Sequence, residues 1–120
     1  MTQTHPDILQ LPLPQQLRYW AQVRPDDIAL RQKEFGIWHT VTWRQYEEQS
    51  RWFGLGLLAL GLQPGQCLAV LSENCREWAF AELGAAFIGA VTAGVYPTSP
   101  APEVAYLLGL SEAPVIVVED

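Results

Sequence analysis

The fold of this chain follows mainly from the stretch between Cys67 and Val118. Its sequence is CLAVLSENCREWAFAELGAAFIGAVTAGVYPTSPAPEVAYLLGLSEAPVIVV. Three short apolar runs alternate in it with two longer stretches of helical spacing, one from about Cys75 to Gly89 and one from Pro100 to Leu110. The apolar runs are CLAVLS, AVTAGVY and VIVV. Continuous apolar runs are typical of strands that are buried on both faces of a sheet. The pattern therefore predicts a βαβαβ unit with a parallel sheet and right-handed crossovers.

The sequence before Cys67 predicts a helix, a β-hairpin and a second helix. Pro14 fits the first turn of a helix that ends before Pro25. The runs IALRQK and IWHTVTW alternate with a period of two on either side of EFG, which places Gly36 in a tight hairpin turn. Thr42 and Gln45, three residues apart, form the capping-box pattern at the start of the second helix.

We therefore expect an α/β chain in which an N-terminal helix and β-hairpin precede a βαβαβ parallel-sheet unit. No linker rich in Ser or Gly divides the sequence, so we expect residues 1–120 to belong to a single domain, with residues 1–11 as a flexible terminus.

The composition is that of a folded, acidic chain. A hydrophobic content of 49% suffices for a core, and a net charge of −6 argues against binding to nucleic acid or to anionic lipid, which need clustered Lys and Arg. The two cysteines form no CxxC motif, and the opening MTQTHPDILQ lacks the pattern of a signal peptide. A reducing cytosol fits these features best.

The stretch from Trp78 to Tyr96 is long enough to cross a bilayer, but Glu82 interrupts it. A charge near the middle of a span costs about 2.5 to 3.5 kcal/mol, and the Ala and Gly residues around it return little of that. We interpret the stretch as a buried helix followed by a buried strand. Trp78 shares a helical stripe with Ala81, Ala85 and Ile88, so we predict that it lies in the core.

Polar residues follow the first two predicted parallel strands. Ser72, Glu73 and Asn74 follow one, and Tyr96, Pro97, Thr98 and Ser99 follow the other. The carboxyl ends of parallel strands share one edge of a sheet, so both groups are candidates for one ligand-binding rim, and we assign Tyr96, Pro97, Thr98 and Ser99 to a substrate rim. Helix capping by Asn74 and Ser99 would also account for polar residues at these positions. Capping and ligand binding are compatible roles.

The sequence offers no catalytic, cofactor-binding or metal-binding residue to which we assign a role. GLGLLALG, from Gly54 to Gly61, lies inside a helical pattern and follows no strand, so it is not a phosphate loop. His5 and His39 lack a second ligand type nearby. Glu119 and Asp120 follow the last strand, where catalytic acids occur, but nothing beside them supports that role.

The order of the motifs resembles the beginning of the acyl-adenylate-forming synthetases. The corresponding residues are Thr42, Trp43 and Tyr46 at a helix start, Leu68–Leu71 in a strand, Glu73, Asn74, Glu77 and Trp78 in an EN-x-x-E-W motif, and Gly89–Pro97 at a proline-bearing strand end. The form GVYPTSPAPEVAYLL is most similar to the long-chain fatty acyl-CoA synthetases of bacterial type. Gln66 stands where the family usually has an acid after Gly65.

The resemblance implies a parent protein that activates a long-chain fatty acid with ATP to acyl-AMP and then transfers the acyl group to CoA, with Mg²⁺ present. It places the family's phosphate loop, adenine-binding strand, ribose-binding aspartate and catalytic lysine beyond Asp120. Residues 1–120 would then be an incomplete N-terminal domain of the AMP-binding type, inactive alone and binding none of these cofactors by itself.

The partners implied by the resemblance are the remainder of the synthetase and a fatty acid, without nucleic acid. The implied location is cytoplasmic, with peripheral membrane association of the parent, and no oligomeric state is indicated. The alternative is a self-contained α/β module that binds a small molecule at the rim without catalysis.

Overall fold

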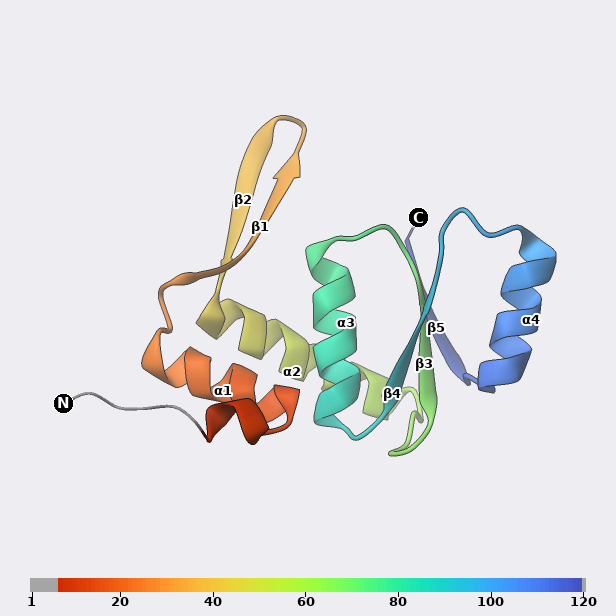
Figure 1. Ribbon diagram of the computed structural model, residues 1–120, viewed down its shortest axis with the longest axis horizontal. Coiled ribbons are helices and arrows are strands. Elements are labelled where there is room, and N and C mark those ends of the chain that lie inside the picture. Colours follow the sequence, from red (N-terminus) through yellow and green to blue (C-terminus); the bar gives the residue numbers. More distant parts are fainter. Residues whose placement is uncertain (1–6, 120) are drawn as a thin grey trace. The chain divides into compact units, whose positions relative to one another are not determined.

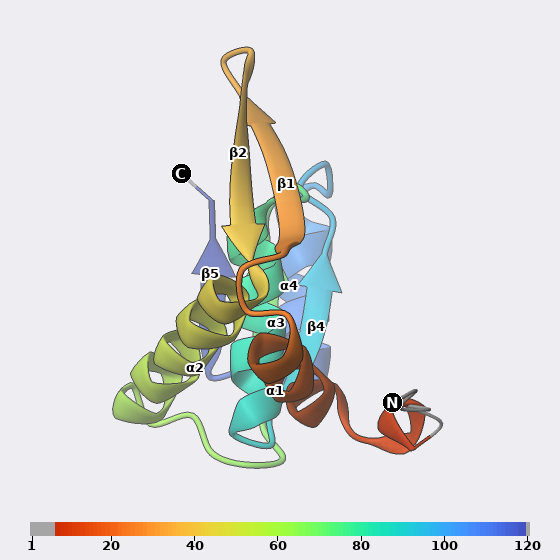
Figure 2. The ribbon, with the colours of Figure 1, turned by 90° about the vertical axis from the view of Figure 1, so that its left-hand side faces the viewer.

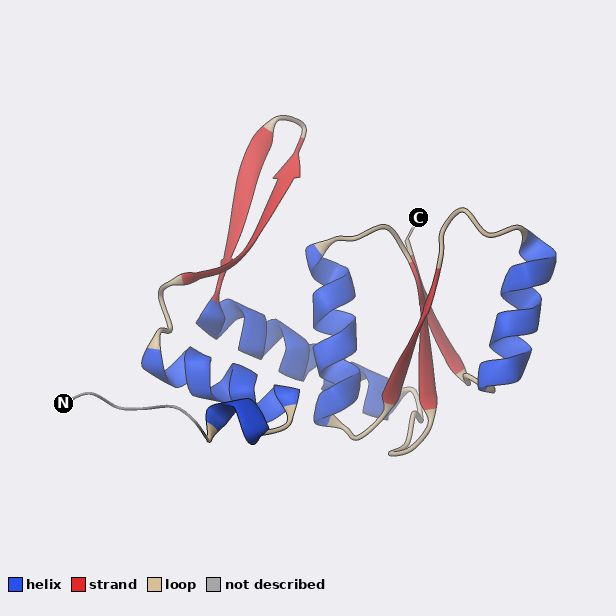
Figure 3. Ribbon diagram, in the orientation of Figure 1, coloured by secondary structure: helices blue, strands red, loops and turns tan. Residues whose placement is uncertain are grey.

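The computed structural model describes residues 7–119, so the predictions for His5 and Asp120 lie outside the described residues. The chain divides into two compact units between Glu48 and Gln49. Two helices and a β-hairpin come first along the chain, and helices and strands alternate from residue 43 onward (Figures 1 and 3). The prediction of a single domain is not decided by this division and stays a prediction.

The N-terminal unit contains the predicted helix and hairpin. A short 3-10 helix, η1 (Ile8–Gln10), precedes α1 (Leu13–Val23), which has a proline in its first turn. The antiparallel strands β1 (Ile28–Glu34) and β2 (Ile37–Thr42) follow (Figure 2). Of the residues expected to form a flexible terminus, 1–6 lie outside the described part.

The hairpin turn consists of two residues, Phe35 and Gly36. Glu34 pairs with Ile37 in the register, and the turn residues have φ values of 50° and 79°. Positive φ at both central positions is the pattern of a type I′ turn, whose twist matches that of the flanking strands. The sequence predicted the glycine in this turn, whereas a phenylalanine at positive φ is unusual.

The capping box predicted at the start of α2 (Trp43–Ala59) is confirmed. The Gln45 amide donates to Thr42 Oγ1 at 3.2 Å, and the Thr42 amide donates to Gln45 Oε1 at 2.9 Å. At the other end, Gly61 adopts a φ of 97° and the Leu62 amide donates to the Leu57 carbonyl at 3.1 Å. Glycine ends the helix because it adopts this left-handed conformation without a steric cost.

The C-terminal unit is the predicted βαβαβ arrangement. Its elements are β3 (Cys67–Leu71), α3 (Arg76–Phe87), β4 (Val91–Val95), α4 (Ala101–Ser111) and β5 (Val115–Val118). All strand pairs are parallel, and the strand order is β4-β3-β5. Helices α3 and α4 lie on opposite faces of this sheet, as Figures 1 and 2 show from two directions. No helix among residues 7–119 is both long and apolar enough to cross a membrane.

The core of this unit lies between the sheet, α3 and the second half of α2. Leu62, Leu68 and Val70 are at most 1% exposed, and Ala81 and Ala85 of α3 pack against them. By contrast, α4 has no buried residue although its sequence is apolar. The burial of Ala81 and Ala85 confirms that the helix predicted between Cys75 and Gly89, which is α3, contributes an apolar face to the core.

Candidate functional site

The two crossovers of the sheet create a crevice at the carboxyl ends of β3 and β4. These strands are neighbours, but the helix after β3 lies on one face of the sheet and the helix after β4 lies on the other. The loops that leave the two strands therefore diverge. Divergence of this kind is the topological switch point at which open α/β sheets bind their ligands.

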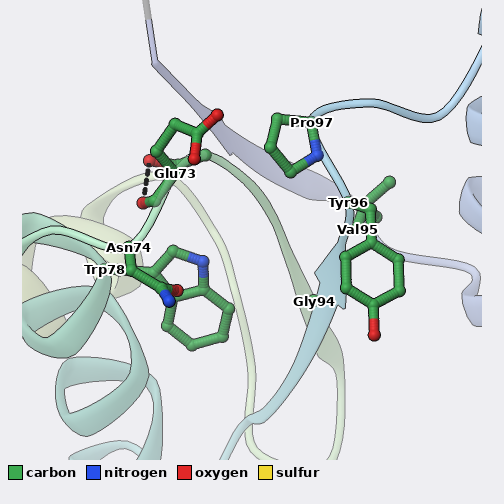
Figure 4. Close-up of a pocket in the computed structure, with 8 residues that line it drawn as sticks. Glu73, Asn74, Trp78, Gly94, Val95, Tyr96 and Pro97 are labelled. Carbon is green, nitrogen blue, oxygen red and sulfur yellow. Dashed lines mark hydrogen bonds between the residues drawn. The ribbon is translucent and has the colours of Figure 1, made fainter.

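A pocket of about 320 Å³ occupies this crevice. The loop after β3 and the first turn of α3 form one wall, and the end of β4 forms the other (Figure 4). The lining residues are Ser72, Glu73, Asn74, Trp78, Gly94, Val95, Tyr96 and Pro97. Asn74 and Trp78 lie on the α3 side, and Tyr96 and Pro97 lie on the β4 side (Figure 4).

Trp78 reaches across the pocket toward β4 because Gly94 has no side chain. A Cβ atom at Gly94 would lie 3.1 Å from Cζ2 of the Trp78 indole, which is tighter than ordinary van der Waals contact. Trp78 is partly buried and packs against the core cluster. Trp78 packs against the core as predicted, but it is only partly buried and also lines the pocket, so the prediction that it is purely a core residue is corrected.

Glu119 fixes the loop that forms the α3 wall. Its Oε1 atom accepts a hydrogen bond from the Glu73 amide at 2.9 Å and another from the Ser72 hydroxyl at 3.4 Å. The Glu119 amide donates to the Leu71 carbonyl at 3.2 Å. Glu119 was a weak candidate for a catalytic acid from sequence, and here its carboxylate joins the ends of β5 and β3.

The helix caps predicted beside the pocket do not form. The N-cap residue of α3 is Cys75, with an extended φ of −152°, and the N-cap residue of α4 is Pro100; neither makes a side-chain capping bond. Asn74 and Ser99 each lie one residue too early to cap. Within residues 7–119 the Asn74 amide group makes no hydrogen bond, so it is available to a molecule in the pocket.

The Glu77 carboxylate lies in the first turn of α3. Partial burial raises the pKa of this carboxyl, but its own backbone amide, the Arg76 guanidinium and Cys75 together outweigh burial and hold the pKa below its usual value. Arg76 Nε lies 3.3 Å from Glu77 Oε1. A negative charge at this position also interacts favourably with the helix N-terminus.

The residues that line this pocket do not by themselves suit the binding of a nucleoside triphosphate. None of its lining residues is basic, and Glu73 brings a carboxylate to its wall. In the described part of the chain, no group of three His, Cys, Asp or Glu side chains is placed to hold a metal ion. The lining combines an indole, a phenol and an amide, which suits apolar or aromatic contact with a few hydrogen bonds.

The structure brings together part of the predicted rim. Tyr96 and Pro97 line the pocket with Ser72, Glu73 and Asn74, as the shared sheet edge predicted. Thr98 and Ser99 do not line the pocket. They lie in the turn after Pro97, in which the Ser99 amide donates a hydrogen bond to the Tyr96 carbonyl at 3.0 Å. The assignment of Tyr96, Pro97, Thr98 and Ser99 to a substrate rim stays a prediction.

Sequence reasoning missed the roles of Gly94 and Glu119. A glycine inside a strand is a signal for close approach of another group, and Gly94 gave that signal opposite a tryptophan. The sequence around Glu119 contains no signal for its role in holding the loop, because its partner Glu73 is 46 residues away in the sequence.

The fold of this chain, with its parallel three-stranded sheet, is similar to that of the N-terminal domains of adenylate-forming enzymes. The N-terminal domain of FACL13 from Mycobacterium tuberculosis, solved with an inhibitor bound, superposes with a TM-score of 0.83 and 28% identity, covering 89% of this chain and 26% of that one. The sequence profile of the family described as AMP-binding enzyme matches residues 17–120. The chain belongs to this family.

Two curated relatives differ in length. The long-chain-fatty-acid–CoA ligase heimdall of Drosophila melanogaster is 42% identical over 83 residues, which are 69% of this chain and 12% of that protein. The uncharacterized protein Rv1549 of Mycobacterium tuberculosis is 33% identical over 99 residues, which are 82% of this chain and 55% of that protein. The chain thus spans 12% of the ligase and about half of the shorter relative.

Proposed function

We propose that this chain is the N-terminal part of a long-chain fatty acid–CoA ligase, which activates a fatty acid with ATP to acyl-AMP and transfers the acyl group to CoA. The observation that carries the proposal is the family match over residues 17–120, together with a relative that is named as such a ligase. The cosubstrates are ATP and CoA, with Mg²⁺. Peripheral association of the parent protein with membranes belongs to the same proposal.

In this proposal residues 1–120 supply a wall of the acyl-adenylate site and no bond-making group. The lining of the pocket supports this role, because it offers an indole and a phenol but no basic side chain for phosphate groups. Tyr96, Pro97, Thr98 and Ser99 would face the substrate at the rim. Phosphate binding and catalysis then fall to other parts of the ligase.

The test is ATP–pyrophosphate exchange with palmitate and Mg²⁺. The 120-residue chain alone should give the same rate as a blank without protein, whereas a complete ligase that contains this chain should show exchange that depends on palmitate. Exchange by the isolated chain above the blank would contradict the proposed division of labour. A complete ligase without palmitate-dependent exchange would contradict the proposed substrate.

A self-contained binding module is the second candidate function. Two observations favour it: every residue that lines the pocket belongs to the C-terminal unit, and a relative exists of which the chain covers 55%. This candidate predicts a sharp two-state melt of a monomer and a rise in melting temperature with a small uncharged aromatic molecule, since the pocket lining has no basic side chain. The ligase proposal predicts a chain that melts broadly or aggregates.

A further inference from the structure

The tip of the β1–β2 hairpin exposes apolar side chains that the fold does not use. Phe35 has a relative exposure of 103%, and Ile37 and Trp38 are each 62% exposed. Single exposed apolar residues are common on protein surfaces. Three of them within four residues at the turn of a hairpin are a feature that a binding partner would explain.

Turn geometry does not explain Phe35 either. Its φ of 50° belongs to the first central position of the type I′ turn, which Asn, Asp and Gly occupy most easily. A bulky side chain at positive φ is strained. Neither packing nor backbone conformation therefore accounts for a phenylalanine at this position.

Basic side chains lie beside the apolar tip. Arg31 and Lys33 are both exposed, lie two residues apart on β1 and so share one face of the hairpin. Lys33 pairs with Trp38 in the register, and its Nζ lies 5.8 Å from the centre of the Trp38 ring. Among residues 7–119, Arg31 and Lys33 form no ion pair with a carboxylate.

The acidic residue of the hairpin is engaged elsewhere. Glu34 lies on the opposite face by strand alternation, where Gln32 Nε2 donates to its Oε1 at 2.7 Å and His39 Nε2 lies 3.8 Å from its Oε2. The face with Arg31 and Lys33 is thus locally basic and aromatic, although the whole chain has a net charge of −6.

We propose that this hairpin tip inserts into the surface of a phospholipid bilayer. Phe35 and Ile37 enter below the headgroups, and the amphipathic indole of Trp38 lies at headgroup level, where tryptophan is enriched in membrane proteins. Arg31 and Lys33 extend their charged ends to lipid phosphates. Zwitterionic lipids carry these phosphates too, so the net negative charge of the chain disfavours only strongly anionic membranes. This inference rests on the membrane association included in the proposed function and names the segment responsible for it. A failure of flotation would leave palmitate-dependent pyrophosphate exchange untouched, so the two proposals fail separately.

Flotation of the 120-residue chain with phosphatidylcholine vesicles tests the proposal. The chain should float with the vesicles, and Phe35→Asn should weaken partitioning by about tenfold, as expected from the loss of one inserted aromatic side chain. The same variant should melt at an equal or higher temperature, because Asn accepts positive φ. Leu110→Asn, which removes an exposed leucine from α4, is the control and should leave partitioning unchanged.

Tryptophan fluorescence identifies the segment that inserts. Vesicles of brominated phosphatidylcholine should quench the emission, Trp38→Phe should remove most of that quenching, and Trp52→Phe, which replaces a tryptophan that is 53% exposed on α2, should not. The proposal is overturned if the chain does not float, if Phe35→Asn floats like the parent, or if only Trp52→Phe removes the quenching. Concentration-dependent dimers that Phe35→Asn abolishes, without flotation, would assign the tip to a second copy of the chain instead.

Discussion

At the residue scale, the carboxylate of Glu119 decides how firmly one wall of the pocket is held. It accepts hydrogen bonds from the Glu73 amide and from the Ser72 hydroxyl, so it ties the loop after β3 to the end of β5. Asn74 is the next residue of that loop and contributes its amide group to the pocket. A residue outside the lining therefore positions residues within it.

We expect Glu119→Ala to speed hydrogen exchange of the Glu73 amide. The lost bond is worth on the order of 1 kcal/mol at an exposed site, which corresponds to about a fivefold increase in exchange rate. Glu119→Gln keeps an acceptor oxygen and should give a smaller increase. Glu103→Ala removes another exposed carboxylate, on α4, and should leave the Glu73 amide unaffected, as measured by NMR. Equal exchange rates in Glu119→Ala and the parent chain would show that the carboxylate does not hold the loop.

At the element scale, helices α2 and α3 cross where each has a glycine. A Cβ atom at Gly84 would lie 2.8 Å from the Ser50 carbonyl oxygen and 2.9 Å from the Gly54 amide nitrogen. Both neighbours are backbone atoms, which cannot rotate away as a side chain can. The Ser50 side chain is fully buried at the same crossing, and its hydroxyl has no hydrogen-bond partner among residues 7–119.

We expect Gly84→Ala to force the two helices apart and to lower the free energy of unfolding by about 1 to 3 kcal/mol, as overpacking of a core typically does. Gly56→Ala is the matched control on α2, since apart from its chain neighbours and the nearby backbone of its own helix no atom lies within 4 Å of its Cβ position, and it should stabilise the helix by up to about 1 kcal/mol. Urea denaturation of both variants measures the difference. A neutral Gly84→Ala would mean that the crossing is looser than these distances indicate.

The elements also show what could be predicted from sequence and what could not. The capping box of Thr42 and Gln45 was predictable because its partners are three residues apart and the hydrogen bonds are local. The predicted caps at Asn74 and Ser99 were wrong because each helix begins one residue later. The place where a chain leaves a strand and enters a helix depends on how that helix packs, which local patterns do not encode.

The order of the strands in the sheet could not be predicted from the sequence, and this matters more for the pocket than the wrong helix caps. Alternating apolar runs predicted three parallel strands and two crossovers, but they are equally compatible with other orders. The order β4-β3-β5 makes β3 and β4 the neighbours whose loops diverge, and only then do Trp78 and Gly94 become the two sides of one pocket. The rim residues were therefore predictable as a group, whereas the role of Trp78 was not.

At the scale of the whole molecule, the C-terminal unit leaves apolar surface uncovered. Strands β4 and β5 are the edges of a three-stranded sheet, and Val91 and Val118 on them are 60% and 58% exposed. An apolar groove of about 270 Å³ runs between α2 and β5, lined by Phe53, Gly56, Leu57, Leu60, Val115, Ile116 and Val117. Bare edges and apolar grooves of this kind favour association with other protein surface.

Ile116→Glu separates the ligase proposal from the binding module. Ile116 is 39% exposed at the groove. If other parts of a ligase cover the groove, a carboxylate there should make the isolated chain less prone to aggregate, because it breaks an exposed apolar edge. The same change should destabilise a complete ligase by about 2 kcal/mol or more, since it buries an unpaired charge.

Thr40→Glu is the control, because it adds the same charge at an exposed position of β2 opposite Arg31 and should affect neither protein. Light scattering of the isolated chain and thermal denaturation of the complete ligase measure the two effects. A self-contained module predicts a different outcome, in which Ile116→Glu leaves the isolated chain unchanged because the groove faces water in the functional protein. Opposite effects on the two proteins, with Thr40→Glu inert, require that the groove is covered in the ligase.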